Sequence, residues 1–458
     1  MAKAIQDNNW LYNFLSPLVQ FGTRCHYQSF DVHGIENLPT DGAYIVAPCH
    51  QQALMEPLAV LNFAPKPPVF LARADIFENP TIRAILTFLK ILPVYRIRDG
   101  QSNLAKNNDI FDRSRDVLLD GFPLCLMAEG RHNDRHHLLP MGKGMFRIAG
   151  ETQLKLGDHP LYIVPTGIDF DDYERPYSNL VVNIGKPIPV QPFMEDFRNN
   201  EPVALNAMRE SLTAALLPLM HDIRNEEYYD EIYTLCKVLN RKVRKEKGMR
   251  NTPWNRFLVR QEISHRLDKE AAEGGERFQT LIANTRKYME QCRKLRIGRR
   301  VIPDHWSLPV TLLATLPLLL LIAGVIWVAP VRWLFFFWLI CYPIPLIPTH
   351  LITKKIIKDS QFRSSVNFGI RFLVSILYVF VIGLVMACCG GAWMSRLADI
   401  GVWWGVIAIG VGHLGAILAG PTVNSLKAIL RNLLYWWKRL TRRKAMKEIR
   451  ETYDLLIR

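Results

Sequence analysis

The chain has 458 residues, with 57 lysines and arginines against 42 acidic residues and a formal net charge of +15. This length exceeds what one ordinary core needs, so we expect two or more units. The basic residues cluster beside long apolar runs in the last third of the chain, which favours anionic lipid headgroups as partners and argues against nucleic acid. The eight cysteines show neither the paired spacing of a disulfide framework nor a Cys-x-x-Cys metal motif. The polar residues after Lys3 predict that no signal peptide is present.

Residues 1–29 are expected to form an amphipathic helix. Apolar side chains recur on one face from Trp10 to Phe21 at helical spacing, over a stretch too short to cross a bilayer. Such a helix can lie in a membrane interface or pack on the adjacent domain, and the sequence leaves both arrangements open.

Residues 30–195 alternate between strand-like and helix-like patterns, which is typical of an α/β domain. The expected strands are short apolar runs at Tyr44–Ala47, Val69–Ala72, Leu124–Met127, Tyr162–Pro165 and Leu180–Ile184. Amphipathic stretches such as Thr81–Lys90 and Ile110–Leu119 are expected to be helices between them. Residues 196–304 become polar and charged, and we expect them to form helices packed beside the α/β domain.

Four apolar runs occupy residues 305–421, and each approaches the ~20 residues that cross a bilayer. They are Leu308–Val328, Trp333–Ile352, Phe372–Trp393 and Val402–Ala419. Their flanks alternate between strongly and weakly basic, so the positive-inside rule predicts two transmembrane hairpins. Residues 422–458 would form a basic cytoplasmic tail. The expected location is therefore the inner or cell membrane, as an integral protein, with the α/β domain and both termini in the cytoplasm.

A histidine follows the first predicted strand of the α/β domain. His50 comes three residues after Ala47, and Glu56 lies shortly beyond it. Strand ends of α/β sheets are where reactive groups are exposed. A carboxylate that fixes the imidazole tautomer lets the histidine take a proton from a hydroxyl, which favours acyl transfer to an alcohol. The alternative for Glu56 is a carboxylate at the positive end of a helix that starts near Pro57.

Three further segments carry polar residues after apolar runs. Ile91–Asp99 contains Arg96, Leu126–Pro140 contains Ala-Glu-Gly-Arg-His at 128–132, and Ile163–Phe170 contains Pro165. Together with His50, and in this order, the four blocks resemble the glycerophospholipid acyltransferase family, whose bacterial type is lysophosphatidate acyltransferase. The resemblance covers roughly residues 30–190.

The resemblance implies an α/β acyltransferase domain, followed in this chain by the helical region and four transmembrane helices. His50 and Glu56 would be catalytic, with His50 as the general base and Glu56 holding its imidazole. The substrate-binding positions would be Arg96, Glu129, Gly130, Arg131, Lys143 and Pro165. Guanidinium and ammonium groups suit an acceptor phosphate, and a carboxylate suits a glycerol hydroxyl or a partner arginine. No cofactor and no metal are expected; acyl-CoA or acyl carrier protein (acyl-ACP) is the co-substrate.

The sequence departs from the family pattern at several positions. Five residues, where most members have four, separate His50 from its acid, which is glutamate in place of aspartate. Cys49 replaces an asparagine often found before the histidine, and Ala128, Arg131 and His132 replace proline, threonine and arginine in the third block. These substitutions bear more on the acceptor than on the reaction type.

The first hypothesis is a membrane-bound acyltransferase that converts lysophosphatidate to phosphatidate. Glycerol-3-phosphate is the second choice of acceptor, and another lipid acceptor, such as one containing an amino acid, is the third. A hypothesis of another class is a non-catalytic membrane protein that binds or transports acyl lipid. The cluster of His132, Asp134, His136 and His137 lacks a recognised ligand spacing, and we interpret it as a solvated loop in preference to a metal site.

Overall fold

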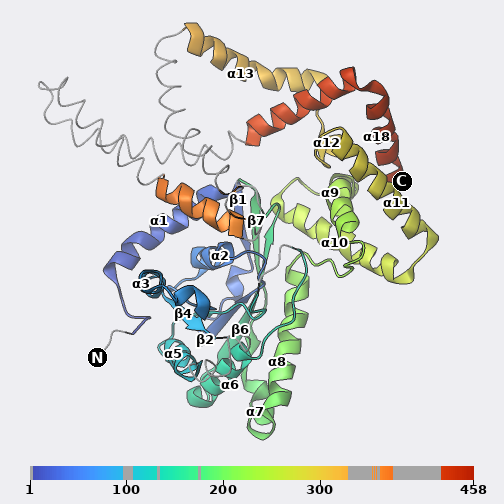
Figure 1. Cartoon of the computed structure of the whole chain (residues 1–458). Helices are drawn as coiled ribbons and strands as arrows, with labels where there is room; N and C mark the ends of the chain where they lie inside the picture. Colours follow the sequence, from blue (N-terminus) through green and yellow to red (C-terminus); the bar gives the residue numbers. More distant parts are fainter. Residues whose placement is uncertain are drawn as a thin grey trace, which may run out of the picture. The chain divides into compact units, whose positions relative to one another are not determined.

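The computed structural model describes residues 4–95, 107–131, 135–173, 177–327, 362–374 and 424–457, together with residues 353, 355 and 357 (Figure 1). Its contacts divide the chain into two units. The first, here called the sheet unit, comprises Met1–Arg24, Ser29–Tyr173 and Ser178–Asp222. The second, the helical unit, comprises Ile223–Arg458 and two short segments, Cys25–Gln28 and Glu174–Tyr177.

Eight strands form one sheet in the described part of the sheet unit. Their order is β1-β7-β6-β2-β5-β3-β4, and β8 lies beside β6. The strands are β1 (Ser29–His33), β2 (Ala43–Pro48), β3 (Val69–Arg73), β4 (Ile91–Val94), β5 (Leu124–Cys125), β6 (Leu161–Phe170), β7 (Asn179–Ile184) and β8 (Ile188–Pro189). The pairs are parallel except where β6 meets β7 and β8.

Strand β2 lies inside the sheet, between β6 and β5. Ile45 is opposite Ile163 on one side and Leu124 on the other, and all residues from Tyr44 to Pro48 are buried. A parallel strand covered on both faces is apolar at consecutive positions, which explains why this run lacks alternation. The chain leaves β2 at the carboxyl end of the parallel strands, and His50 follows there.

Helices accompany these strands in alternation, as the sequence predicts. They are α1 (Trp10–His26), α2 (Met55–Phe63), α3 (Pro80–Phe88), α5 (Asn107–Leu119), α6 (Gly144–Leu156), α7 (Met194–Asn199) and α8 (Glu201–Leu216). Asn79 caps the N-terminus of α3: its side chain accepts hydrogen bonds from the amides of Thr81 and Ile82, and Pro80 is the first helical residue. Helices α5, α6 and α8 contact the sheet. Helices α7 and α8, from the polar region after residue 195, thus belong to the sheet unit.

The helical unit contains α9 (Tyr229–Glu246), α10 (Pro253–Glu273), α11 (Glu276–Lys294), α12 (Val301–Asp304), α13 (Leu308–Trp327), a helix over residues 424–441, and α18 (Arg443–Leu456). Its core is a cluster of buried apolar side chains from the bundle and from the C-terminal segment. Val259, Phe278, Tyr288 and Ile449 are among its members. The C-terminal residues are therefore part of a packed core, where the sequence suggested a tail.

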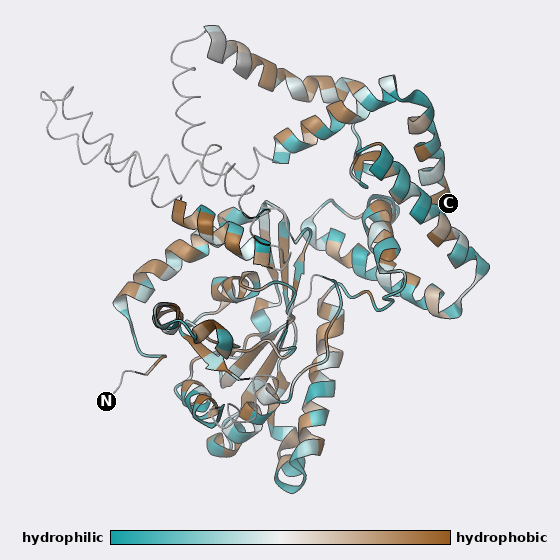
Figure 2. Ribbon diagram, in the orientation of Figure 1, coloured by the Kyte–Doolittle hydropathy of each residue, from teal (hydrophilic) through white to brown (hydrophobic). Residues whose placement is uncertain are grey.

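The prediction of four transmembrane helices is wrong. Among the helices that the structure describes, none combines the length and apolar character needed to cross a membrane. Helix α13 corresponds to the first predicted span and is coloured brown along much of its length in Figure 2. Apolar composition alone does not establish a span, and Pro317 removes a backbone hydrogen bond inside α13. The other three predicted spans lie outside the described residues, apart from 372–374, and the cellular location stays a prediction.

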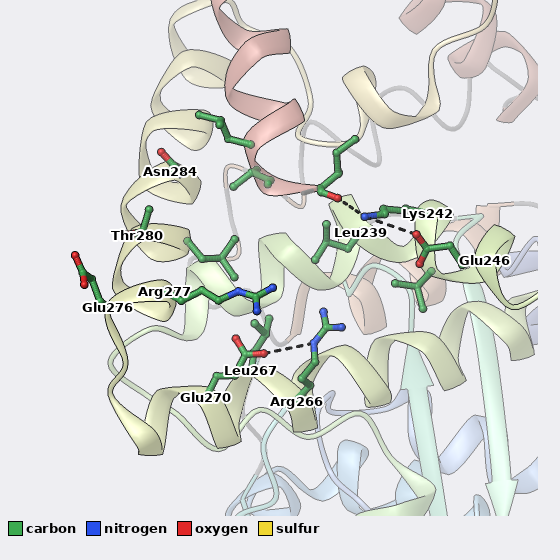
Figure 3. A pocket seen from close by; sticks show the side chains of 15 residues that line it. Leu239, Lys242, Glu246, Arg266, Leu267, Glu270, Glu276, Arg277, Thr280 and Asn284 are labelled. Atoms are coloured by element: carbon green, nitrogen blue, oxygen red, sulfur yellow. Dashed lines mark hydrogen bonds and ion pairs between the residues drawn. The ribbon is translucent and has the colours of Figure 1, made fainter.

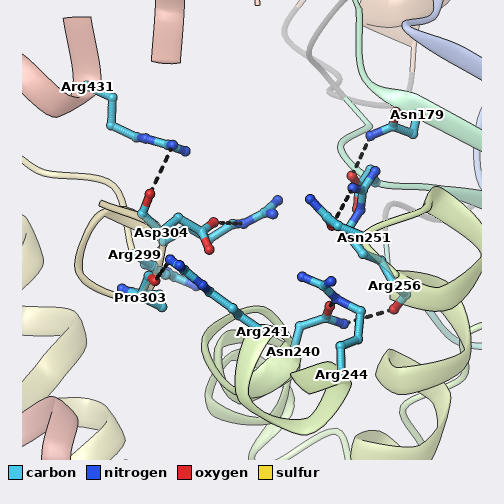
Figure 4. Close-up of polar contacts among 12 residues, drawn as sticks. Asn179, Asn240, Arg241, Arg244, Asn251, Arg256, Arg299, Pro303, Asp304 and Arg431 are labelled. Atoms are coloured by element: carbon cyan, nitrogen blue, oxygen red, sulfur yellow. Dashed lines mark hydrogen bonds and ion pairs between the residues drawn. The ribbon is translucent and has the colours of Figure 1, made fainter. Parts of the chain in front are cut away.

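A group of arginines surrounds Asp304 in the helical unit (Figure 4). The Asp304 carboxylate accepts a hydrogen bond from Arg300 Nε at 3.1 Å. Its backbone carbonyl accepts one from Arg431 at 3.4 Å, while Arg241 donates to Pro303 O at 2.6 Å. Burial lowers the pKa of Arg431, and the negative charge of Asp304 opposes that shift. Asp304 therefore balances part of a concentrated positive charge.

Asp304→Asn should lower the free energy of unfolding by about 1–2 kcal/mol, since it leaves several arginines without this countercharge. The loss should be larger at low than at high ionic strength, because salt screens the remaining repulsion. Thermal unfolding at two salt concentrations measures it. Glu290→Gln, which breaks an exposed pair with Lys294 on α11, is the matched control and should change little. A salt-independent loss would contradict the electrostatic explanation.

Candidate active site

His50 follows the carboxyl end of β2 and is held by its backbone. Cys49 N donates to Thr166 O on β6 at 3.1 Å, and His50 N donates to Glu129 Oε1 at 2.7 Å. The imidazole keeps 13% of its surface exposed, in a region where its sequence neighbours are buried. A largely enclosed imidazole on a fixed backbone can meet a substrate while its orientation is set by the protein.

Glu56 lies in the first turn of α2 with its side chain fully buried. Its Oε1 accepts hydrogen bonds from the backbone amides of Gln51, at 2.8 Å, and Gln52. Its Oε2 lies 3.7 Å from His50 Nδ1, within ion-pair range and longer than a hydrogen bond. The two interpretations of Glu56 thus describe one arrangement, because the carboxylate at the helix start also faces the imidazole. The pair leaves Nε2 of His50 as the nitrogen that can reach a substrate.

Glu129 anchors the same loop from the other side. Its Oε1 accepts from His50 N, and its Oε2 accepts from Leu139 N at 2.8 Å. Both oxygens are therefore bonded to backbone amides, where the sequence suggested a contact with a glycerol hydroxyl or an arginine. Gly130 follows with a φ of 63°, in the left-handed region that favours glycine, and so allows the chain to turn directly after Glu129.

Burial raises the pKa of Glu129 from 4.5 to about 7, and the hydrogen bonds from Leu139 and His50 partly oppose this shift. The folded protein therefore binds the carboxyl proton of Glu129 more tightly than the unfolded chain does. Binding of this proton stabilises the folded state at low pH, and the stabilisation is lost as the pH rises from 4.5 to about 7. Glu129→Gln cannot titrate. The stability advantage of wild type over this variant should therefore shrink by up to about 3 kcal/mol across that range. Urea unfolding of both proteins at about pH 5 and about pH 8 measures the change, and a pH-independent difference would contradict it.

The other predicted site residues do not all converge on His50. Arg131 and Lys143 are exposed, Arg131 in the loop after β5 and Lys143 at the start of α6. Pro165 is buried on β6 opposite Ala47 of β2, so it shapes the sheet beneath the site. Arg96 lies outside the described residues. The structure therefore brings His50, Glu56 and Glu129 together and leaves two cations at the surface of the same unit.

Tyr173 contacts the two residues that follow His50, and the sequence did not predict these contacts. Tyr173, after β6, places its hydroxyl 2.9 Å from Gln51 Oε1 and 2.9 Å from His136 Nδ1. Gln52 Nε2 donates to Tyr173 O at 3.0 Å. The contacts of Tyr173 with Gln51 and Gln52 join residues more than a hundred positions apart, so no local motif signals them. His136, interpreted as part of a solvated loop, is 1% exposed.

A cavity of about 670 Å³ lies in the helical unit, lined by α9, α10, α11 and the end of α18 (Figure 3). Four of its charged side chains form two pairs: Arg266 lies 3.8 Å from Glu270, and Lys242 lies 3.6 Å from Glu246. Neither histidine nor cysteine lines it. It lies outside the residues that match the acyl-transfer pattern of the sequence, so His50 and its two carboxylates form the candidate active site.

Comparison with known proteins identifies the class of domain that contains these residues. Residues 29–169 match the family model described as Acyltransferase. The chain therefore carries an acyltransferase domain, which contains His50, Glu56 and Glu129, and it is an acyltransferase. Comparison with curated proteins gives no match.

Among the solved structures that match the chain, one is an acyltransferase that aligns with part of its length. It is the 1-acyl-sn-glycerophosphate (LPA) acyltransferase PlsC from Thermotoga maritima, with 21% identity over 44% of this chain and 80% of that chain. The TM-score is 0.30, and at this value the likeness carries no conclusion about substrate or mechanism.

Proposed function

We propose that the protein transfers a fatty acyl chain from acyl-CoA or acyl-ACP to the free hydroxyl of a phosphorylated glycerol, with lysophosphatidate as the preferred acceptor. The observation that carries this proposal is the position of His50, partly exposed at the end of β2, with the buried Glu56 carboxylate 3.7 Å from its Nδ1. The order of the sequence blocks and the acyltransferase match over residues 29–169 support the same reaction.

In the proposed reaction, His50 Nε2 removes the proton from the acceptor hydroxyl as its oxygen attacks the thioester carbonyl carbon. The carbon–sulfur bond then breaks, and the imidazolium returns the proton to the leaving thiolate. Glu56 stabilises the imidazolium and keeps the required tautomer. Glu129 holds the backbone of His50 and takes no part in the proton transfer. The products are the ester and the free thiol, and the reaction needs no acyl-enzyme intermediate.

A phosphate on the acceptor would meet positive charge at the surface of the domain. Arg131 and Lys143 flank the loop that contains Leu139, whose amide binds Glu129. A guanidinium and an ammonium on these two segments would favour an anionic headgroup over a neutral one. Glycerol-3-phosphate has the same phosphate without the acyl chain, so it is the second candidate acceptor.

Competition among acceptors tests the substrate class. The purified full chain would receive labelled acyl-CoA or acyl-ACP with equal concentrations of lysophosphatidate, glycerol-3-phosphate and monoacylglycerol, the uncharged match to lysophosphatidate. We expect lysophosphatidate to be acylated first, and we expect Lys143→Ala to raise its KM while leaving the KM for monoacylglycerol unchanged. Preferential acylation of monoacylglycerol would refute the proposed phosphate recognition.

A further inference from the structure

Three buried side chains with metal-binding atoms meet in the sheet unit. His136 lies in the loop after β5, Asp169 lies near the end of β6, and His221 follows the short helix η5 (Leu217–Leu219). One ligand atom from each side chain lies within 4.8 Å of the other two. The residues are 1%, 2% and 1% exposed, respectively. Nitrogen and carboxylate donors are thus gathered in the interior, where an isolated charge is costly.

The spacing of these donors suits a small ion. His136 Nδ1 lies 3.7 Å from Asp169 Oδ1, and the His136 and His221 ring centroids are 4.5 Å apart. Donors around a tetrahedral zinc ion, at bond lengths of about 2.1 Å, are about 3.4 Å from one another. The largest separation between donor atoms, at most 4.8 Å, therefore has to shorten by less than about 1.5 Å, and rotation of the side chains can supply this.

Backbone contacts fix the segments that carry the donors. A side chain at Gly167 on β6 would place its Cβ 2.0 Å from Leu219 O, so this glycine lets the segment before His221 approach the strand that carries Asp169. Asp222 Oδ1 accepts from Leu138 N at 3.1 Å and ties the same segment to the loop of His136. Three separate parts of the sheet unit are thus held together around the donors.

The chemistry of the donor set points to a transition metal. Two imidazoles and one carboxylate bind divalent first-row ions, with zinc the usual ion for a closed site of this size. The Tyr173 hydroxyl, 2.9 Å from His136 Nδ1, can donate its proton to Gln51 Oε1 and turn an oxygen lone pair toward the same space. We propose that His136, Asp169 and His221 bind one divalent first-row metal ion, with zinc preferred.

Such an ion would act on the structure and would not touch the substrate. It would join β6, the loop after β5 and the segment after α8, and Tyr173 would extend that order to Gln51, next to His50. Because a bound metal stabilises the folded state in proportion to its affinity and concentration, its removal should lower the thermal stability of the whole chain. This proposal is independent of the acceptor substrate.

Metal content of the wild-type chain is the first test. The full chain, purified without a histidine tag, should contain about one zinc ion per molecule or take up about one after chelation. Zinc should raise its Tm, and cobalt should give the visible absorption bands of a tetrahedral site. X-ray absorption at the zinc edge should show two imidazoles in the coordination shell. A wild-type chain that binds neither zinc nor cobalt would overturn the proposal. A coordination shell of oxygen atoms alone would also overturn it, since the bound zinc would then be an adventitious ion only.

Matched variants locate the site. His221→Gln and Asp169→Asn should each reduce the bound zinc well below one equivalent and abolish the rise in Tm with zinc. His137→Gln, which changes a neighbouring histidine 3.3 Å from Asp222, should keep full occupancy, as should His50→Ala. Equal zinc binding by wild type and a folded His221→Gln, shown by an unchanged circular dichroism spectrum, would refute this assignment. The spectroscopic test on wild type decides the matter if both site variants fail to fold.

Discussion

His50→Ala should lower kcat by about 10²–10⁴, the range that general-base help usually supplies. The effect follows from the position of the imidazole, which is fixed through His50 N by Glu129 and faces Glu56 with its Nδ1. The acceptor would still bind, because the surface cations are unchanged, so KM should change much less than kcat. Steady-state kinetics with a saturating acyl donor measure both quantities.

The control for this variant is His159→Ala, which removes an exposed histidine from the same unit. It should keep wild-type kinetics. Exogenous imidazole should restore part of the activity of His50→Ala if the lost function is proton transfer. If His50→Ala kept the wild-type kcat, His50 would not be the general base, and the assignment of the active site would be wrong.

Glu56→Gln should retain the fold and lose about 10³–10⁴ in kcat, because it changes the tautomer of His50. The amide oxygen can still accept from the backbone of Gln51 and Gln52, as Oε1 of Glu56 does. The amide nitrogen would then donate toward His50 Nδ1, which leaves the proton on Nε2 and deprives the base of its lone pair. Measuring kcat beside the midpoint of urea unfolding separates the two effects.

Glu56→Ala serves as the comparison. It leaves the buried amides of Gln51 and Gln52 without an acceptor, and it should cost about 1–3 kcal/mol of stability in addition to activity. Glu56→Asp, which keeps the charge on a shorter side chain, should recover part of the kcat lost in Glu56→Gln. Full activity of Glu56→Gln would show that the carboxylate does not set the state of His50.

Local sequence was sufficient to place the centre of this site. The apolar run at Tyr44–Ala47 predicts the buried strand, and the residues after it place His50 at the carboxyl end of the sheet. The short separation of Glu56 from His50 lets one loop and one helical turn bring them together, so pattern and spacing carry enough information.

Contacts between distant segments could not be predicted in this way. Glu129 was singled out as a substrate ligand, and only the fold shows that both its oxygens accept backbone amides. The approach of His221 to Asp169 depends on Gly167, a single small residue in a strand pattern. Burial of His136 likewise depends on residues far along the chain, and a polar local sequence predicts the opposite.

The membrane prediction failed for a different reason. It rested on the length and composition of apolar runs such as Leu308–Val328, and these two properties alone do not establish a membrane span. The basic sequence of residues 422–458 predicts a tail, yet Tyr435 and Ile449 lie in the core of the helical unit. Composition describes what a helix can contact, and tertiary structure decides which contact it makes.

The most direct test of the central claim is acyl transfer by the purified chain, followed by mass spectrometry of the lipid product. With a labelled acyl thioester and lysophosphatidate, wild type should give one ester product and one released thiol per turnover, and His50→Ala should give almost none. Product must disappear when either substrate is omitted. Thiol release without an acylated acceptor, or equal product from a folded His50→Ala, would contradict transfer through His50.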